Sequence, residues 1–148
     1  FSRFLEANGN ENDVLLAKIT PCFENGKLGV ARDLKNSVGF GSSEFIVFRC
    51  KEILEPEYLY HFLNQKIFRE KGKKNMYGSV GHKRVGKEFI ENTNIGVPSI
   101  KKQKQIVKKL NFVNLEKNRS INTLNSQIDN YIALKSSILS NSLKSRSL

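Results

Sequence analysis

The most restrictive feature of this 148-residue sequence is a stretch of more than forty residues near its end, 99–143, that contains neither proline nor glycine. Since these two residues are the strongest helix breakers, the stretch predicts one long helix. Its apolar side chains recur at steps of three and four residues, with a four-residue stutter between 117 and 121. The residues of this seam are Ile106, Leu110, Val113, Ile121, Leu124, Ile128, Tyr131 and Ile138. A narrow apolar stripe of this kind requires a partner helix.

The part of the chain before this helix begins with short β-type runs separated by turns. The runs are "VLLAKI", "LGVAR", "NSVGFGSS" and "EFIVFR", and the last is apolar on both faces, which predicts a buried strand. A helix then opens at Glu55-Pro56, because proline is tolerated at a first helical position. We expect this helix to continue to Gly72, with its apolar face formed by Leu59, Phe62, Leu63 and Ile67.

A short helical piece "KEFIEN" and an extended "NIGVP" complete the first part of the chain. The pattern predicts an α+β fold: a small β-rich domain over residues 1–98, followed by one long coiled-coil helix over residues 99–148. No stretch is apolar enough for a membrane span and the first residues lack a signal-peptide pattern, so we expect a cytoplasmic protein without membrane contact.

Positive charge is concentrated in one region. The formal net charge is +11, and residues 66–109 contain thirteen Lys or Arg against three Glu. A one-sided basic segment is the electrostatic footprint of a protein that neutralises phosphates. An acidic protein partner and a solvated basic face are the alternatives that composition leaves open.

The segment 72–86, "GKKNMYGSVGHKRVG", has four glycines and no acidic residue, and it therefore predicts an exposed basic loop. Side chains of this loop and its flanks could reach DNA phosphates: Lys73, Lys74, Lys83, Arg84 and Lys87. Three side chains of the loop could hydrogen-bond base edges: Ser79, His82 and Arg84. The alternative is a flexible loop whose basic residues only confer solubility.

No catalytic or metal-binding pattern is present. The turn "ITPCFENGK" contains Cys22, but Cys50, His61 and His82 are isolated, so neither a nucleophile pair nor a zinc site is indicated. "GHKRVGKE" imitates a phosphate-binding loop, yet Glu88 stands where Ser or Thr would hold magnesium. The proline motif of adenine methyltransferases and the clustered carboxylates of metal nucleases are both missing. We therefore predict a non-catalytic protein with no cofactor.

The turn 19–27 is better explained as a shaped loop than as a reactive site. Pro21, Asn25 and Gly26 are typical turn residues that set the backbone. In this interpretation Cys22 and Phe23 pack inward, and the flanking lysines face phosphate: Lys18 and Lys27.

Four segments together resemble the specificity (S) subunit of type I restriction-modification systems. They are "DVLLAKITPCFENGKLGVA", "GFGSSEFIVFR", "MYGSVGHKRVGKEFIENTNIGVPSIKKQKQIVKKL" and the terminal helix. The resemblance implies a target recognition domain followed by a long helix. It also implies that two such units pair their helices as an antiparallel coiled coil. Each domain then reads one half of a split DNA sequence, and Ser42 and Ser43 join the DNA-facing residues. The subunit itself is non-catalytic: it places methyltransferase (M) subunits on double-stranded DNA, and motor-nuclease (R) subunits join them.

The sequence departs from the family pattern at the helix start and in extent. Ser99 replaces a second proline and can act as an N-cap, whereas Lys102 replaces a glutamate that would favour the helix dipole. Only one recognition unit is present, and it lacks an opening segment, so we expect either an N-terminally incomplete half-subunit or a fragment of a split or decayed gene. Its helix would pair with a second S-type helix, in a homodimer or with another half. The alternative is a truncated coiled-coil interaction protein without autonomous DNA reading.

Overall fold

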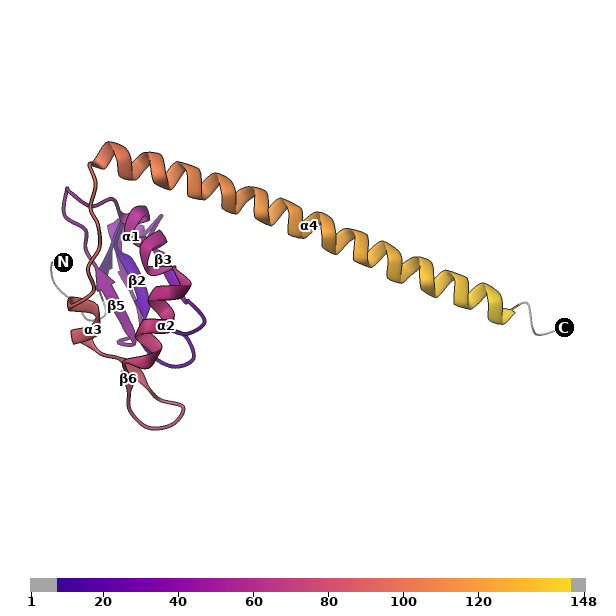
Figure 1. Cartoon of the computed structure of the whole chain (residues 1–148), viewed down its shortest axis with the longest axis horizontal. Coiled ribbons are helices and arrows are strands. Elements are labelled where there is room, and N and C mark those ends of the chain that lie inside the picture. Colours follow the sequence, from indigo (N-terminus) through magenta and orange to yellow (C-terminus); the bar gives the residue numbers. More distant parts are fainter. Residues whose placement is uncertain (1–7, 145–148) are drawn as a thin grey trace. The chain divides into compact units, whose positions relative to one another are not determined.

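The structure, a computed structural model, describes residues 8–144 as a small domain followed in sequence by one long helix (Figure 1). The predicted α+β class is confirmed. The chain divides into two compact units, one up to Lys108 and one from Lys109 onward, so the first unit includes the opening turns of the long helix. Within the described residues, no helix combines the length and the apolar character that crossing a membrane requires.

The centre of the domain is a three-stranded antiparallel sheet with the strand order β3-β2-β5. Its strands are β2 (Val14–Ala17), β3 (Leu28–Val30) and β5 (Phe45–Phe48). Leu16 of β2 lies opposite Leu28 on one side and Ile46 on the other. Residues 46–48 are each at most 5% exposed, which confirms that "EFIVFR" contains a buried strand.

A separate two-stranded ribbon is formed by one strand that precedes the sheet in sequence and one that lies between β3 and β5. β1 (Asn8–Asn10) pairs with β4 (Val38–Phe40), and the 3₁₀ turn η1 (Lys35–Ser37) leads into β4. The buried carboxylate of Asp13 fixes the loop between β1 and β2. It accepts hydrogen bonds from the Asn10 backbone N–H at 2.7 Å and from Arg49 Nε and Nη2 at 3.0 and 2.7 Å.

The helical region after β5 consists of two helices, not the single helix that the apolar spacing predicts. α1 (Pro56–Leu63) ends where Asn64 caps it, and α2 (Lys66–Lys74) begins after Gln65, whose backbone is extended. This break changes which face of the second helix is buried. Ile67, expected on the apolar face, is 58% exposed, and the neighbouring Phe68 is buried instead.

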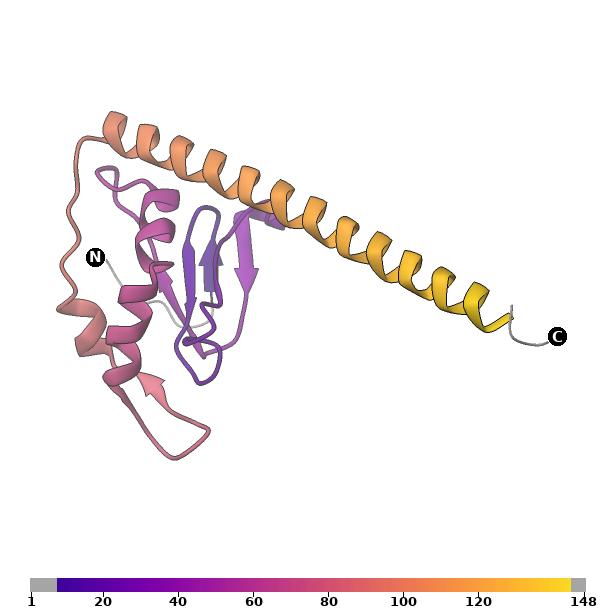
Figure 2. The same ribbon diagram turned by 45° about the vertical axis from the view of Figure 1, so that its right-hand side comes forward.

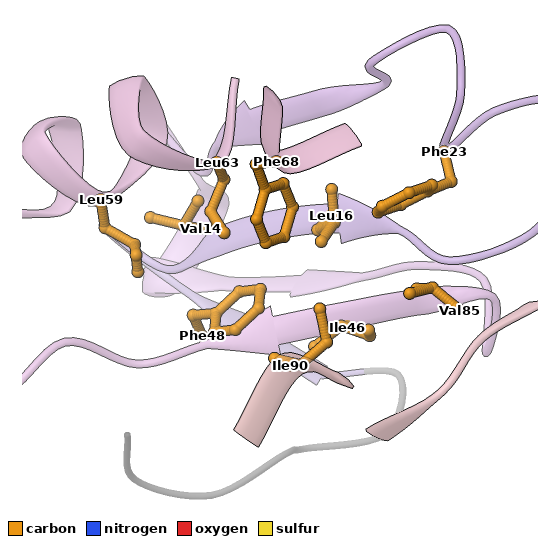
Figure 3. Close-up of a cluster of buried hydrophobic side chains, with 10 residues drawn as sticks. All are labelled: Val14, Leu16, Phe23, Ile46, Phe48, Leu59, Leu63, Phe68, Val85 and Ile90. Carbon is orange, nitrogen blue, oxygen red and sulfur yellow. The ribbon is translucent and has the colours of Figure 1, made fainter. Parts of the chain in front are cut away.

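The hydrophobic core lies between the sheet and these helices (Figure 3). Side chains from the sheet strands, the two helices, β7 (Arg84–Val85), α3 (Lys87–Glu91) and the turn after β2 all contribute to it. The members are Val14, Leu16, Phe23, Ile46, Phe48, Leu59, Leu63, Phe68, Val85 and Ile90. Because the core draws on β2, β5 and β7 together, it also fixes the loops that join these strands.

Gly72 does not end a helix, although the sequence predicts that it does. It lies inside α2 and is buried, and the ring of Phe23 packs directly against it. A Cβ atom at this position would lie 2.3 Å from Cζ of Phe23, far inside the van der Waals contact distance. The close approach of this ring to the helix backbone therefore explains the glycine.

Replacing Gly72 by alanine is expected to destabilise the domain by about 1–3 kcal/mol, because the buried Phe23 ring must move. The sign of this stability change is informative, because the same replacement in an exposed helix interior would stabilise a protein by about 1 kcal/mol. Thermal unfolding followed by circular dichroism measures it. Gly29→Ala is the control, because nothing lies within 4 Å of a Cβ at that position. A Gly72→Ala variant at least as stable as the wild type would contradict this packing.

The long helix α4 (Ile100–Lys144) starts at the predicted cap, because Ser99 Oγ accepts a hydrogen bond from the Lys102 N–H at 3.4 Å. Three hydrogen bonds of one side chain then join its start to the domain. The fully buried Gln103 donates through Nε2 to the carbonyls of Ile53 and Pro98, and its Oε1 accepts from the Glu55 N–H at 2.9 Å. This glutamine ties the start of α4 to the loop after β5.

Candidate nucleic-acid interface

The segment 72–86 is only partly the predicted loop: residues 72–74 still belong to α2, and the rest forms a short hairpin between β6 (Met76–Tyr77) and β7. Figure 2 shows this hairpin as the pink ribbon that projects from the lower end of the domain. Gly78 and Gly81 adopt positive φ angles of 121° and 82°, which side-chain-bearing residues rarely adopt. A Cβ at Gly78 would also lie 2.9 Å from the His82 carbonyl oxygen. The glycines therefore shape a tip whose residues 77–83 are all exposed.

The segment that follows β2 is hydrogen-bonded to the returning strand of this hairpin. The Val85 N–H donates to the Lys18 carbonyl, and the Thr20 N–H donates to the Lys83 carbonyl, both at 2.9 Å. Ile19 and Arg84 form an antiparallel bridge between these two bonds. The turn and the basic loop are more than sixty residues apart in sequence, and this pairing places them side by side.

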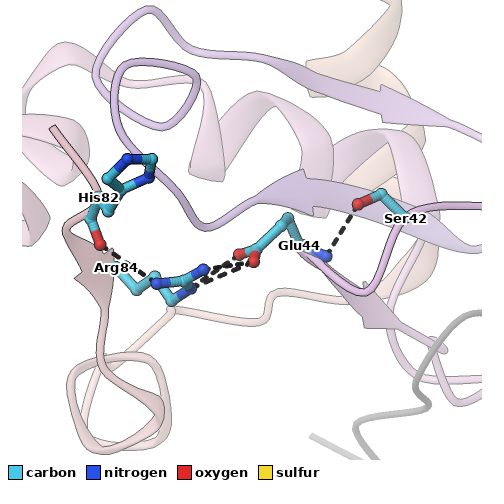
Figure 4. A network of polar contacts seen from close by, with 4 residues as sticks. All are labelled: Ser42, Glu44, His82 and Arg84. Atoms are coloured by element: carbon cyan, nitrogen blue, oxygen red, sulfur yellow. Dashed lines mark hydrogen bonds and ion pairs between the residues drawn. The ribbon is translucent and has the colours of Figure 1, made fainter. Parts of the chain in front are cut away.

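A third segment, 42–44 directly before β5, joins the other two through Glu44 (Figure 4). The Glu44 carbonyl accepts a hydrogen bond from the Lys18 N–H at 2.9 Å. Its carboxylate accepts from Nη2 and Nε of Arg84, at 2.6 and 2.9 Å. The hydrogen bond from Arg84 lowers the pKa of Glu44 and raises that of Arg84, so both groups are ionised at neutral pH. We name segments 18–20, 42–44 and 82–85 together the three-segment surface.

The turn 19–27 has the shape that its composition predicts. Phe23 is fully buried, as expected, whereas Cys22 is only half-buried. Gly26 has a positive φ of 70°, and the Lys27 N–H closes the turn on the Cys22 carbonyl at 2.9 Å. The backbone of this turn therefore holds Lys27 next to the end of β2, where the Ala17 N–H donates to its carbonyl.

The surroundings of the second cysteine, Cys50, do not favour a reactive thiol. Burial raises the pKa of Cys50 to about 11, so almost no thiolate exists at neutral pH. Across residues 8–144, no group of three or more His, Cys, Asp and Glu side chains is arranged to bind a metal ion.

The seam predicted on α4 lies on a continuous helix, and most of its side chains are exposed. Ile106 is half-buried in the domain, since it lies in the first unit. The exposed fractions of the remaining seam residues run from 38% at Leu110 to 72% at Tyr131. An isolated helix thus leaves a long apolar stripe in water, which a partner helix would bury.

Residues 5–130 match the family model described as the type I restriction modification DNA specificity domain. The chain belongs to this family. It is 40% identical over 102 residues to the specificity subunit of the type I restriction enzyme EcoAI from Escherichia coli. The aligned region covers 68% of this chain and 17% of the relative. It is 39% identical over 98 residues to the EcoEI specificity subunit of the same organism, which covers 66% and 16%. The chain therefore spans about one sixth of the length of these relatives.

The fold of this specificity-domain chain is also found in a solved chain. That chain comes from a structure described as the structural basis of complex assembly and conformational transition of the type I R-M system. The similarity has a TM-score of 0.58 at 20% identity, and it covers 75% of this chain and 25% of the solved one. It shows that the fold is shared over three quarters of this chain.

The specificity domain brings some of the predicted contact residues together and leaves others apart. The three-segment surface contains Lys18, Ser42, Ser43, His82, Lys83 and Arg84, and Ser79 lies in the adjoining tip. Lys73 and Lys74 are exposed at the end of α2, directly before the hairpin. Lys87 begins α3 beyond β7, and its Nζ lies 3.2 Å from Glu91.

Glu44 is the residue of this surface that the sequence interpretation missed. It is separated from Arg84 by forty residues, and a carboxylate within a basic region does not by itself indicate a role. The only sequence indication is its position directly after Ser42 and Ser43 in "GFGSSEF". Its carboxylate changes the interpretation of Arg84, whose charge is paired and no longer available to phosphate alone.

Proposed function

We propose that this chain is a DNA-reading part of a type I restriction-modification specificity subunit. The observation that carries the proposal is the three-segment surface, in which exposed basic and hydroxyl side chains from distant parts of the sequence lie together. Phosphate contacts from lysines would fix the register on the duplex, and polar side chains would read base edges. The contribution is binding and positioning, with the reaction carried out by other subunits.

The proposed partners follow from the same family membership. Double-stranded DNA would bind the domain, and methyltransferase and motor-nuclease subunits would be positioned on that DNA. The exposed stripe of α4 would pair with a second S-type helix, either in a homodimer or with another half-subunit. A role restricted to this helix pairing is the second candidate, and DNA binding by the chain distinguishes the two.

Replacing Lys83 by alanine is expected to weaken DNA binding and to lower the salt dependence of the binding constant by about one unit of slope. The reason is that each lysine on phosphate releases condensed counterions, and Lys83 is exposed at the hairpin tip. Fluorescence anisotropy with a labelled duplex between low and physiological salt measures the slope.

Lys51→Ala is the matched control for this charge change. Lys51 is exposed in the loop after β5. Glu44, which belongs to the three-segment surface, directly precedes β5, so Lys51 lies at the other end of this strand. The control should leave the slope unchanged. Equal slopes for Lys83→Ala and the wild type would remove Lys83 from the interface, and absence of DNA binding by the wild type would contradict the proposed function.

A further inference from the structure

Arg84 is held with part of its guanidinium group unused. Nε and one N–H of Nη2 donate to Glu44, and one N–H of Nη1 donates to the His82 carbonyl at 3.2 Å. A guanidinium group has five N–H groups. Two therefore remain, one on each terminal nitrogen, and neither has an acceptor within residues 8–144. The side chain is 41% exposed, so these groups are accessible from solvent.

A pair of N–H groups on adjacent nitrogens fits one base in particular. Guanine presents two acceptors, N7 and O6, side by side in the major groove, and arginine binds both in the most frequent specific protein–DNA contact. Adenine replaces one of these acceptors with a donor, which an arginine cannot satisfy. The unused part of Arg84 therefore matches guanine and rejects adenine.

The orientation of the guanidinium is fixed before DNA arrives. Three hydrogen bonds to Glu44, two of them shared by Nε, and one to His82 restrict rotation about the long arginine side chain, so less conformational freedom is lost on binding (Figure 4). Fixation of this kind favours discrimination between bases over non-specific attraction, since a mobile arginine could move to the nearest phosphate.

The charge balance of the pair supports the same role. Glu44 and Arg84 are both ionised and together carry no net charge, so the pair contributes little to attraction of the phosphate backbone. An unpaired carboxylate in this position would repel DNA. The exposed Lys83 next to it supplies the phosphate-directed charge.

We propose that Arg84 is a specificity-determining residue that reads a guanine through its two unused N–H groups, with Glu44 as the positioning residue that orients it. This inference rests on the DNA-reading function proposed above. It names one base of the target and the residue that selects it. A purely structural Glu44–Arg84 pair, which only ties β5 to the hairpin, is the opposing explanation.

The test begins with the unaltered 148-residue chain. Selection from a randomised duplex library defines its preferred sequence, and each guanine of that sequence is then replaced in turn by 7-deazaguanine, which lacks the N7 acceptor. We expect one position at which this replacement weakens binding roughly five- to tenfold, the loss of one hydrogen bond of a bidentate pair. Arg84→Lys should reduce the sensitivity at this position only, because lysine lacks the rigid planar pair of donors that engages N7 and O6 together.

Glu44→Gln tests the positioning role separately. It removes a negative charge, so affinity for unselected DNA should stay equal or increase, while preference for guanine at the same position falls several-fold. A merely structural role would lower both, together with the melting temperature. Lys83→Ala is the control, because it should weaken all duplexes alike and keep the guanine preference.

Each outcome is decisive. A wild-type chain that selects no sequence would overturn the proposed function, and the inference with it. A preferred sequence without guanine, or equal 7-deazaguanine sensitivity of the wild type and Arg84→Lys at every guanine, would overturn only the inference. Circular dichroism would show whether Arg84→Lys folds. If it does not, Glu44→Gln and the wild-type scan test the inference instead. The absence of an N7-sensitive guanine, or an unchanged guanine preference in Glu44→Gln, would then contradict the guanine-reading role of Arg84.

Discussion

Replacing Phe23 by alanine is expected to lower the free energy of unfolding by about 3–5 kcal/mol. The side chain is 0% exposed, its ring centroid lies 6.0 Å from that of Phe68, and it packs against the backbone of Gly72. Truncation leaves a cavity that the surrounding aromatic rings cannot fill without moving α2. Since domains are stable by only about 5–15 kcal/mol, this one change removes a large part of the total.

Denaturant unfolding followed by circular dichroism measures the loss. Phe40→Ala is the matched control, because this phenylalanine is 87% exposed and its truncation should change stability by less than about 0.5 kcal/mol. Phe23→Leu, which retains most of the apolar volume, provides a folded comparison if the alanine variant does not accumulate. A loss below about 1 kcal/mol for Phe23→Ala would mean that the turn does not anchor the core.

The second large effect concerns the helix seam. Replacing Leu124 and Ile128 together by aspartate should weaken association of the chain with a second S-type helix at least about a hundredfold, because two carboxylates would be buried in an apolar seam. Both residues are more than half exposed on α4, so the change should leave the domain folded. Sedimentation equilibrium across a range of concentrations measures the association.

Leu115→Asp is the control for the seam variant. Leu115 lies nine residues before Leu124, two and a half helical turns, and hence on the opposite face of α4. It is 49% exposed, similar to the seam positions, and its replacement should leave the association intact. A double variant that associates as tightly as the wild type, or equal weakening by Leu115→Asp, would contradict the assigned seam.

Local features of this fold could be predicted where the sequence alone decides the outcome. The absence of proline and glycine after Ser99 gives the long helix, and the serine hydroxyl caps it as expected. The run "EFIVFR" gives a buried strand because both of its faces are apolar. Pro56 begins α1 at the predicted position.

The predictions that were wrong depended on packing between distant segments. Gly72 is a usual helix stop, yet here it lies within α2 because the ring of Phe23 occupies the space of a side chain. Spacing alone placed Ile67 on the buried face, whereas the break after Asn64 turns Phe68 inward. Neither effect is visible in a local window of sequence.

The candidate interface shows the same division. Composition predicted the basic loop and the turn 19–27 as separate features, and the family resemblance added the hydroxyl residues before β5. These three segments lie together because the backbone of Lys18 is hydrogen-bonded to Val85 and to Glu44, and only the folded chain forms these bonds. The pairing of Glu44 with Arg84 likewise required the structure, since nothing in the sequence selects this carboxylate among the others.

The most direct test of DNA reading compares two duplexes of identical length and composition. One carries the sequence that the 148-residue chain selects from a random library, and the other carries the same bases in permuted order. At physiological salt we expect the selected duplex to bind at least tens of times more tightly, because several base contacts of about 1–3 kcal/mol each distinguish the two. Equal dissociation constants, with binding governed by salt alone, would contradict sequence recognition by this chain.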